Sequence, residues 1–235
     1  MSPPLLLAFY QTKLYSLIMQ FGKQAVTPRE RTKQAQIRDG ARRVFLANGF
    51  AATSTDAIAT KAGVSKQTLY VYYRTKEQLL VDVLQDIVGQ LPDVSSTIAA
   101  GGPVDSPKAL RSCLMSLARE LVAHWMQPDY VAFMRLVFAE IPRMAQLSEL
   151  WQQAIVAKVI GTTTTLLETA RANGIARFGN TDAAVRLFIG PLVTFVVLEG
   201  LGTAEPPRRP SDRVVKQIVD LYLEAIASPT SGGAA

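Results

Sequence analysis

The side chains best suited to binding chemistry lie together in the stretch 62–73, AGVSKQTLYVYY. Lys66 offers a cation, Gln67 an amide and Thr68 a hydroxyl, and three tyrosines follow within five residues. This set of groups suits a surface of phosphates and base edges. The helix that carries them is about nine residues long, and isolated helices shorter than about 12–15 residues are marginal in water. Neighbouring elements must therefore hold it in place.

Charge is distributed unevenly along the 235 residues, of which 49% are hydrophobic, enough for a core in one large or two small domains. The formal net charge is +6, and all of it lies in residues 1–91, where 12 Lys and Arg face 6 Asp and Glu. Residues 92–235 are neutral, with 13 residues of each sign. A local basic surface favours a polyanionic partner for the first part.

Residues for catalysis or metal binding are scarce. Cys113 is the only cysteine and His124 the only histidine, so neither a disulfide framework nor a Cys/His zinc site can form within one chain. They should lie about 16 Å apart along one helix. General acid–base chemistry would depend on one His and scattered carboxylates. We therefore expect no catalytic residues, no metal and no cofactor, and a reducing, cytoplasmic setting fits.

The first strong helix signal is at Thr27. Thr27 caps the helix, Pro28 takes its first position and Glu30 completes a capping box. Asn48-Gly49 should end this helix, with Phe50 folding back on its last turn. Its predicted buried stripe has helical spacing and consists of Ile37, Ala41, Val44 and Phe45.

Two short helices follow the first one. Thr55 is predicted to cap a helix over 56–62, and Gly63 to stop it. After a three-residue turn, Ser65 should cap the next helix, with Leu69 as its inward anchor. Such a pair is a helix-turn-helix, in which the second helix enters the major groove of DNA while the first crosses the backbone.

The remaining elements are also predicted to be helical. Thr75 should cap a helix that runs to about Leu91, with Gln78 as its capping-box partner. The Pro/Gly/Ser-rich stretch 92–105 is predicted to be a connection. No strand pattern competes, and further helices are predicted at about 107–126, 129–141, 148–172, 182–200 and 212–227.

The stretch 37–91 resembles the DNA-binding domain of the tetracycline-repressor (TetR) family of bacterial transcriptional regulators. The residues that carry the resemblance are GFAATSTDAIATKAGVSKQTLYVYYRTKEQLL at 49–80, with an F-x-x-x-G-F approach and an LYxYYxxKExLL exit. The resemblance of the later half is looser: RLVFAEIPRMAQL at 135–147 is similar to the AefR-like subgroup of regulatory domains.

The resemblance implies a DNA-contacting set. Recognition-helix side chains of the family meet base edges, where Gln67 suits adenine N6/N7 and Lys66 suits guanine O6/N7. Tyr70, Tyr72 and Lys76 fall where the family commonly touches phosphates, and the alternative for the two tyrosines is that they only pack. Tyr73 is expected to pack inward with Leu69. The implied set is Thr55, Ser65, Lys66, Gln67, Thr68, Tyr70, Tyr72 and Lys76.

For the later half, the resemblance implies small-molecule binding and dimerisation through the last two helices, about 182–200 and 212–227. The first of these is apolar on nearly every side. The helices before them offer apolar and aromatic side chains suited to an apolar or amphipathic effector, although any one can be simple core. The candidate ligand-binding residues are Leu117, Leu121, His124, Trp125, Phe133, Val137, Phe138, Trp151 and Ile155, with Tyr130, Arg135 and Glu140 as further polar anchors.

The predicted fold is all-α, with an N-terminal three-helix DNA-binding domain and a C-terminal helical ligand-binding and dimerisation domain. The predicted parts are an extension at 1–26, the DNA-binding domain at 27–75, the regulatory domain at 76–227, whose helix 76–91 connects the two, and a disordered tail at 228–235. The expected protein is a homodimeric repressor that binds a palindromic operator in double-stranded DNA and is released by an effector.

Two rival interpretations remain open. The segment 5–21 could be an amphipathic arm of a sequence-nonspecific or membrane-associated DNA-binding protein. It could equally be a packed or disordered extension, or follow from a start codon chosen too early. The longest apolar run, 187–201, is interrupted and shorter than the ~20 residues of a membrane span, so a buried helix and no stable membrane insertion are expected.

Overall fold

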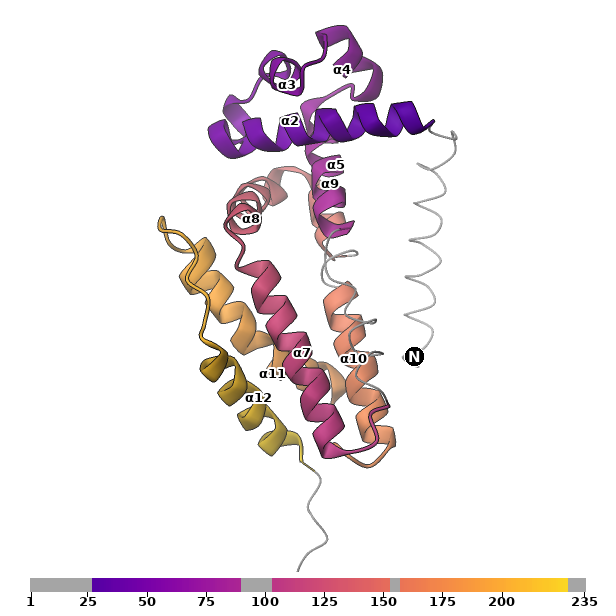
Figure 1. Ribbon diagram of the computed structural model, residues 1–235, viewed down its shortest axis with the longest axis vertical. Helices are drawn as coiled ribbons and strands as arrows, with labels where there is room; N and C mark the ends of the chain where they lie inside the picture. The colour runs from indigo at the N-terminus through magenta and orange to yellow at the C-terminus, as the bar shows by residue number, and fades with distance from the viewer. Residues whose placement is uncertain (1–26, 90–102, 153–156, 228–235) are drawn as a thin grey trace, which may run out of the picture. The chain divides into compact units, whose positions relative to one another are not determined.

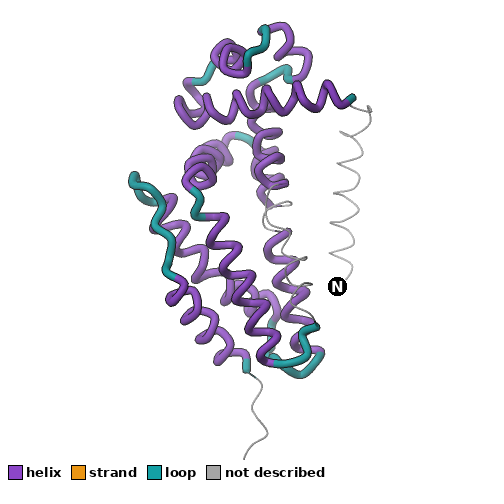
Figure 2. The backbone as a smooth tube through the Cα atoms, in the orientation of Figure 1, coloured by secondary structure: helices purple, strands orange, loops and turns teal. Residues whose placement is uncertain are grey.

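The computed structural model describes residues 27–89, 103–152 and 157–227. The chain divides into two compact units, Met1–Gly89 with Phe138–Ile155 and Gln90–Val137 with Val156–Ala235. The described residues of both units are built from helices (Figures 1 and 2), and one isolated antiparallel bridge joins Ala176 to Ala227. The predicted all-α fold is thus confirmed.

The described residues of the first unit form five α-helices, one turn of 3₁₀-helix and the last residues of α8. Helix α2 contacts both α3 and α5, α3 contacts α4, and α5 contacts α9. The bounds are α2 Pro28–Ala52, α3 Thr55–Ala62, α4 Lys66–Tyr72, α5 Lys76–Gly89, the 3₁₀ turn η1 Ile141–Arg143 and α9 Ala145–Leu150.

Both ends of the predicted first helix are confirmed. The Thr27 N–H donates to a Glu30 carboxylate oxygen at 2.7 Å, and the Glu30 N–H donates to Thr27 Oγ1 at 3.3 Å, which completes the capping box. The helical course is broken at Gly49, whose φ is +76°. Phe50 is buried beyond this break, and its ring lies 5.6 Å from that of Phe45.

The core of the first unit requires close approach of α2 and α3. A Cβ atom on Gly40 would lie 2.7 Å from the Cβ of Ala62, so no larger residue fits without a shift of one helix. The side chains buried around this contact are fully or almost fully shielded from solvent and comprise Ile37, Ala41, Phe45, Ile58, Leu69, Leu79, Leu80 and Leu84.

The second unit packs its helices around α11, which contacts α7, α10 and α12, while α12 also contacts α7. The division between the units falls within α8, after Val137. The bounds are α7 Pro107–Trp125, α8 Pro128–Glu140, α10 Ala157–Ala172, α11 Thr181–Val196, the π-helix η3 Val197–Leu201 and α12 Asp212–Ile226.

The predicted helix bounds agree with these elements, with one difference. The predicted helix 148–172 is not one described helix, because α9 ends at Leu150 within the first unit and α10 begins at Ala157 within the second. Residues 148–172 therefore belong to two units.

Specific polar contacts tie α12 to its neighbours. Arg119 Nε and Nη2 donate to the two carboxylate oxygens of Asp212 at 2.7 and 2.9 Å, and Arg111 pairs with Asp220. The Tyr222 hydroxyl donates to the Ala184 carbonyl of α11 at 3.1 Å. The register between α12, α7 and α11 is therefore set by directional contacts as well as by apolar packing.

Helix α11 and η3 differ from the expected buried helix. Residues Thr181–Leu201 form a segment long and apolar enough, by length and composition alone, to cross a membrane. Only 33% of the most apolar part of this segment is buried. The expectation of burial is corrected for Leu187, Val197 and Leu198, which are well exposed within this chain.

Candidate nucleic-acid interface

The turn between α3 and α4 follows the predicted geometry. Gly63 ends α3 with φ +64°, a left-handed conformation that favours glycine, and its N–H bonds to carbonyls of the last helical turn. The Val64 N–H donates to the Ala59 carbonyl at 3.0 Å. Ser65 then caps α4 by accepting a hydrogen bond from the Thr68 N–H at 3.0 Å.

The predicted cap of α3 is wrong by one residue. Ser54 is the N-cap, with extended backbone, and its Oγ accepts a hydrogen bond from the Ala57 N–H at 3.1 Å. Thr55 is the first helical residue, and its Oγ1 lies 3.2 Å from the Tyr70 hydroxyl of α4. Two adjacent hydroxyl residues offer equivalent caps in sequence, and Ser54, whose backbone is extended, is the one that caps α3.

Helix α4 presents a mostly polar face to solvent. Lys66 and Gln67 are exposed, Tyr70 is 43% exposed and Val71 is 76% exposed. Tyr72 is half-buried. The predicted base-reading positions thus lie on the outer surface of the unit, with the exception of Thr68.

Thr68 is held more closely than its neighbours. Its side chain is half-buried, and its Oγ1 lies 2.8 Å from Ser65 Oγ. Both hydroxyls therefore already have a partner within the N-cap of α4. To reach a base edge, Thr68 would have to share or give up this contact.

An ion pair joins the start of α4 to the start of α3. Lys66 Nζ lies 2.8 Å from Asp56 Oδ1 and 3.0 Å from Asp56 Oδ2. The hydrogen bond and the charge of Asp56 raise the pKa of Lys66 above its ordinary value. Sequence reasoning did not single out Asp56, because the contact spans ten residues and crosses the turn.

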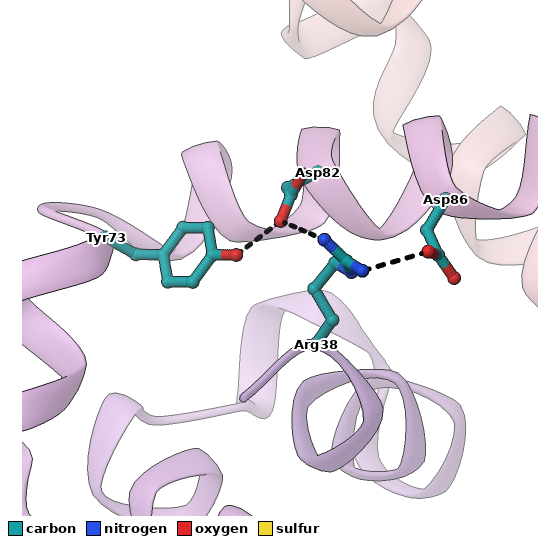
Figure 3. Close-up of polar contacts among 4 residues, drawn as sticks. All are labelled: Arg38, Tyr73, Asp82 and Asp86. Atoms are coloured by element: carbon teal, nitrogen blue, oxygen red, sulfur yellow. Dashed lines mark hydrogen bonds and ion pairs between the residues drawn. The ribbon is translucent and has the colours of Figure 1, made fainter. Parts of the chain in front are cut away.

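A polar network holds the C-terminal end of α4 (Figure 3). The Tyr73 hydroxyl donates to Asp82 Oδ2 of α5, and Arg38 of α2 lies 3.4 Å from the same oxygen. Arg38 also pairs with Asp86 at 3.1 Å. One guanidinium and two carboxylates thus connect α2 and α5 to the residue that ends α4.

This network explains how a seven-residue helix stays folded. Tyr73 is buried as predicted, and its N–H donates to the Leu69 carbonyl at 2.9 Å. Burial first, and then the hydrogen bond to Asp82, raise the pKa of Tyr73 far above its ordinary value, so its hydroxyl remains a donor at neutral pH. The neighbouring helices supply the stability that α4 lacks alone.

Lys76 makes contacts within the fold that the sequence did not indicate. Its Nζ donates to the carbonyls of Phe50, Ala51 and Thr53 at 3.0, 3.2 and 3.3 Å, and it lies 4.6 Å from the centroid of the Phe50 ring. These carbonyls close the end of α2, where a cation is favourable. All three ammonium donors are occupied within the unit, and the predicted phosphate contact stays a prediction.

The missed residues had only weak signals in the sequence. Asp82 and Asp86 are four residues apart, so they lie on one face of α5 and could have indicated a buried partner. Gln36 is another case: its Nε2 donates at 2.6 Å to the Ala62 carbonyl at the end of α3. Neither partner is close in sequence, so no local pattern identifies it.

The predicted ligand-binding residues are divided between the units. Phe138 and Trp151 belong to the first unit, where their rings meet edge to face with centroids 4.6 Å apart. Ile155 lies outside the described residues. The apolar members in the second unit are all buried and comprise Leu117, Leu121, Trp125, Phe133 and Val137.

His124 is the polar member of this set. It is half-buried, its Nε2 is shielded from solvent without a hydrogen-bond partner, and its ring lies 4.8 Å from that of Tyr130. Burial first, and the charge of Lys158 second, lower its pKa, so the neutral imidazole is favoured. An unpartnered Nε2 in such a site can donate to or accept from a polar group of a ligand.

Two further predicted anchors have partners within the chain. Arg135 Nη2 donates to the carbonyl of Gly200 at 2.5 Å and also to that of Thr203, at the end of η3. Glu140 pairs with Arg143 at 3.6 Å. Arg135 therefore links α8 to the end of the α11–η3 segment.

An exposed apolar surface lies on the last helices of the second unit. We call it the α11/α12 face; its large side chains are Leu187, Val193, Val197 and Leu198 from α11 and η3 and Leu221 from α12, exposed by 37–65%. Single exposed apolar side chains are normal at a protein surface, but a contiguous apolar patch is typical of an interaction surface. Because α11 contacts both η3 and α12, these side chains lie on adjacent elements.

Two family models, both of transcriptional regulators, match this chain. The model of "Bacterial regulatory proteins, tetR family" matches residues 37–83, and that of "AefR-like transcriptional repressor, C-terminal domain" matches residues 112–227. The HTH-type transcriptional regulator EthR of Mycolicibacterium smegmatis is 21% identical over 205 residues, which cover 87% of this chain and 91% of the relative.

Solved structures agree with these matches. A TetR-family regulator from Mesorhizobium loti has a TM-score of 0.71 and 25% identity, with 86% of this chain and 100% of that chain covered. The flavonoid-responsive regulator FrrA has a TM-score of 0.59 and 27% identity, with 85% and 99% covered. The helix-turn-helix and the helices that follow it thus have counterparts over most of the chain.

Proposed function

Because the chain belongs to the TetR family of bacterial transcriptional regulators, we propose that it is a homodimeric repressor that a small molecule releases from a palindromic operator. The protein is a DNA-binding regulator and not an enzyme. The observation that carries the proposal is the helix-turn-helix of α3 and α4, whose second helix exposes a cation and an amide.

Within this proposal, the residues of α4 divide between base edges and phosphates. Gln67 is exposed at the N-terminal end of the helix and suits a bidentate contact with adenine. Tyr70 and Tyr72 direct phenol groups toward phosphates, with Thr55 beside Tyr70. Lys76 contributes to phosphate binding only if it leaves the carbonyls at the end of α2.

Dimerisation is proposed through the α11/α12 face. Its apolar side chains are 37–65% exposed among the described residues, and a second copy of the same face would bury them. This explains the long apolar segment Thr181–Leu201 without a membrane, and a cytoplasmic location follows for a protein that acts on DNA. Two recognition helices related by a two-fold axis must read inverted half-sites.

An effector site is proposed within the second unit, between α7 and α8. Their buried side chains suit an apolar or amphipathic molecule, and His124 offers a polar anchor. The name of FrrA describes a flavonoid-responsive protein, which supports an aromatic effector bearing hydroxyl groups as one test compound class. By reciprocity, an effector that weakens operator binding must itself bind more weakly to the operator complex.

The proposal is tested by selection of bound fragments from genomic DNA, followed by footprinting. A protected inverted repeat is expected, and Gln67→Ala should relax the preference at one position of each half-site by about 1–3 kcal/mol. Protection without sequence preference would instead favour the rival, a nonspecific DNA-binding protein. Calorimetric titration of a candidate effector with and without operator then tests release, and equal affinities would contradict it.

A further inference from the structure

The Asp56–Lys66 ion pair occupies an unusual place for a carboxylate. Both side chains are more than half exposed, at 65% and 53%, and both lie at the N-terminal ends of the two helices of the helix-turn-helix. In such motifs the N-terminal residues of the second helix contact base edges. A carboxylate beside them is repelled by the phosphates of DNA, so Asp56 opposes binding unless it meets a donor.

Two adjacent contacts fix the position of this pair. Lys66 and Tyr70 are four residues apart and share one face of α4. Their partners, Asp56 and Thr55, are neighbours in the first turn of α3. The ammonium and the carboxylate are thus held side by side, with both carboxylate oxygens within 3.0 Å of Nζ.

A pair of this kind matches one base pair better than the others. In the major groove, guanine presents the acceptors N7 and O6, and cytosine presents the N4 amino donor beside them. Lys donates to guanine O6/N7, and Asp accepts from cytosine N4. An A·T pair keeps the N7 acceptor, but it presents the N6 amino donor of adenine in place of guanine O6 and the O4 acceptor of thymine in place of cytosine N4. The carboxylate of Asp56 would then face an acceptor and have no donor on the base pair.

We propose that Lys66 and Asp56 read one G·C base pair in each half-site as a unit, the ammonium on guanine and the carboxylate on cytosine. Asp56 is then a specificity-determining residue. It also reduces nonspecific binding, because a Lys66 that turns toward a phosphate leaves the carboxylate unpaired in the field of the DNA. This inference rests on the proposed function.

A purely structural role for Asp56 has a different signature. An acidic residue in the first turn of α3 stabilises the helix through its dipole. Its loss would then lower stability and weaken binding to all sequences alike. Base preference at a single position separates the two roles, and the stability of each variant is measured beside it.

The experiment is selection of bound DNA from randomised sites with the full chain, as wild type, Asp56→Asn, Asp56→Glu and Lys66→Met. The matched control is Asp39→Asn, which removes the same charge from the same unit and from an exposed ion pair, with Arg43 at 2.5 Å. Affinities for the selected site and for unrelated DNA follow at several salt concentrations.

Asp56→Asn is expected to lose about tenfold or more of the discrimination for G·C at one position per half-site. It should also bind unrelated DNA more tightly than Asp39→Asn does. Lys66→Met should relax the same position, and Asp56→Glu should retain the preference. Asp39→Asn should leave every position unchanged.

Either of two results would overturn the inference: an unchanged preference in Asp56→Asn, or loss of preference at different positions in Asp56→Asn and Lys66→Met. Both leave the proposed function intact, because the wild type still selects an inverted repeat. Failure of the wild type to select any site contradicts the proposed function itself, and the inference with it.

Discussion

The outer face of α4 and the α11/α12 face are both exposed, but they are exposed in different ways. On α4 several polar groups already have partners within the chain, as Lys66 has in Asp56 and Tyr70 in Thr55. On α11 and α12 the exposed groups are large and apolar, with Leu198 and Leu221 both 65% exposed.

This difference teaches what each face can tolerate. Paired polar groups are stable in water, so the face of α4 can stay open and exchange its partners for DNA when an operator is present. Apolar surface that stays exposed to water is destabilising, by roughly 25 cal/mol for each Å² relative to the same surface buried in an interface. The first face therefore suits a reversible partner, and the second suits a permanent one.

The strongest test of the comparison places a charge in the apolar face. Leu221→Asp should convert the dimer to a monomer at about micromolar concentration, because an unpaired carboxylate in an apolar interface is costly. Operator affinity should fall by about 100-fold or more, since each half-site is then bound separately. Sedimentation velocity and operator titration measure the two effects.

The control for this variant is Ala123→Asp, which adds the same charge at an exposed position of α7. It should remain dimeric, and both variants should keep their helicity because neither position is buried. A Leu221→Asp protein that still sediments as a dimer would show that the α11/α12 face has another partner.

The next test sharpens the contrast between polar pairs at the surface and those near the core. Asp82→Ala removes the acceptor shared by Tyr73 and Arg38, whose polar atoms then lie in a partly buried site without that partner. The free energy of unfolding should fall by about 1–3 kcal/mol. Urea denaturation of the full chain measures the change.

Asp39→Ala is the matched control for the network, because its ion pair with Arg43 is exposed. Surface pairs are worth about 0–1 kcal/mol, so its effect should be much smaller. Equal losses in the two variants would mean that the network around Asp82 contributes no more than a surface pair, and α4 would then need another source of support.

The fold was largely predictable because its signals are local. The capping box at Thr27, the left-handed Gly63 and the cap at Ser65 each act within four residues, and the structure has all three. The predictions that were wrong concerned features that are ambiguous locally, as between Ser54 and Thr55, or that are decided by packing between distant segments. The assignment of 138–155 to the first unit is of the second kind.

The candidate site was predictable in its position but not in its contacts. The exposed place of Gln67 on α4 follows from helical periodicity, with Leu69 inward. The partners of Lys66 and Lys76 do not follow from periodicity, because a long flexible side chain can reach many acceptors. The acceptor of Lys66 is 10 residues away in sequence, and those of Lys76 are 23 to 26 residues away. The phosphate contact predicted for Lys76 came from the family resemblance, and the sequence could not reveal the three carbonyls that Lys76 contacts.

Lys76→Met tests whether this lysine contributes more to the stability of the fold than to the binding of DNA phosphates. Methionine keeps an apolar stem of similar length but leaves the carbonyls at the end of α2 without their donor. Stability should fall by about 1 kcal/mol, the upper end of the usual range for a cation at the C-terminal end of a helix. The salt dependence of operator binding should keep its slope, whereas loss of a phosphate contact would lower it by about 0.9 for each subunit.

The smallest effect is expected in the second unit, where the polar group is a single imidazole and not a network. Burial and Lys158 lower the pKa of His124 in the folded state below its ordinary value of 6.5. In the unfolded chain this imidazole takes up a proton more readily than in the folded one. Stability is therefore lost as the pH falls through about 6.5 and below, and regained as it rises.

His124→Gln should remove this component of the pH dependence. Each unit of difference in pKa corresponds to about 1.4 kcal/mol, but the side chain is only half-buried and water screens its charge, so the expected loss between pH 7.5 and 5.5 is below about 1 kcal/mol. Because His124 is the only histidine in the chain, the variant contains no other imidazole that titrates in this range. Urea denaturation at the two pH values compares wild type and variant. The same acid loss in both proteins would assign it to carboxylates, and the unpartnered Nε2 would then have no measurable part in the stability of the second unit.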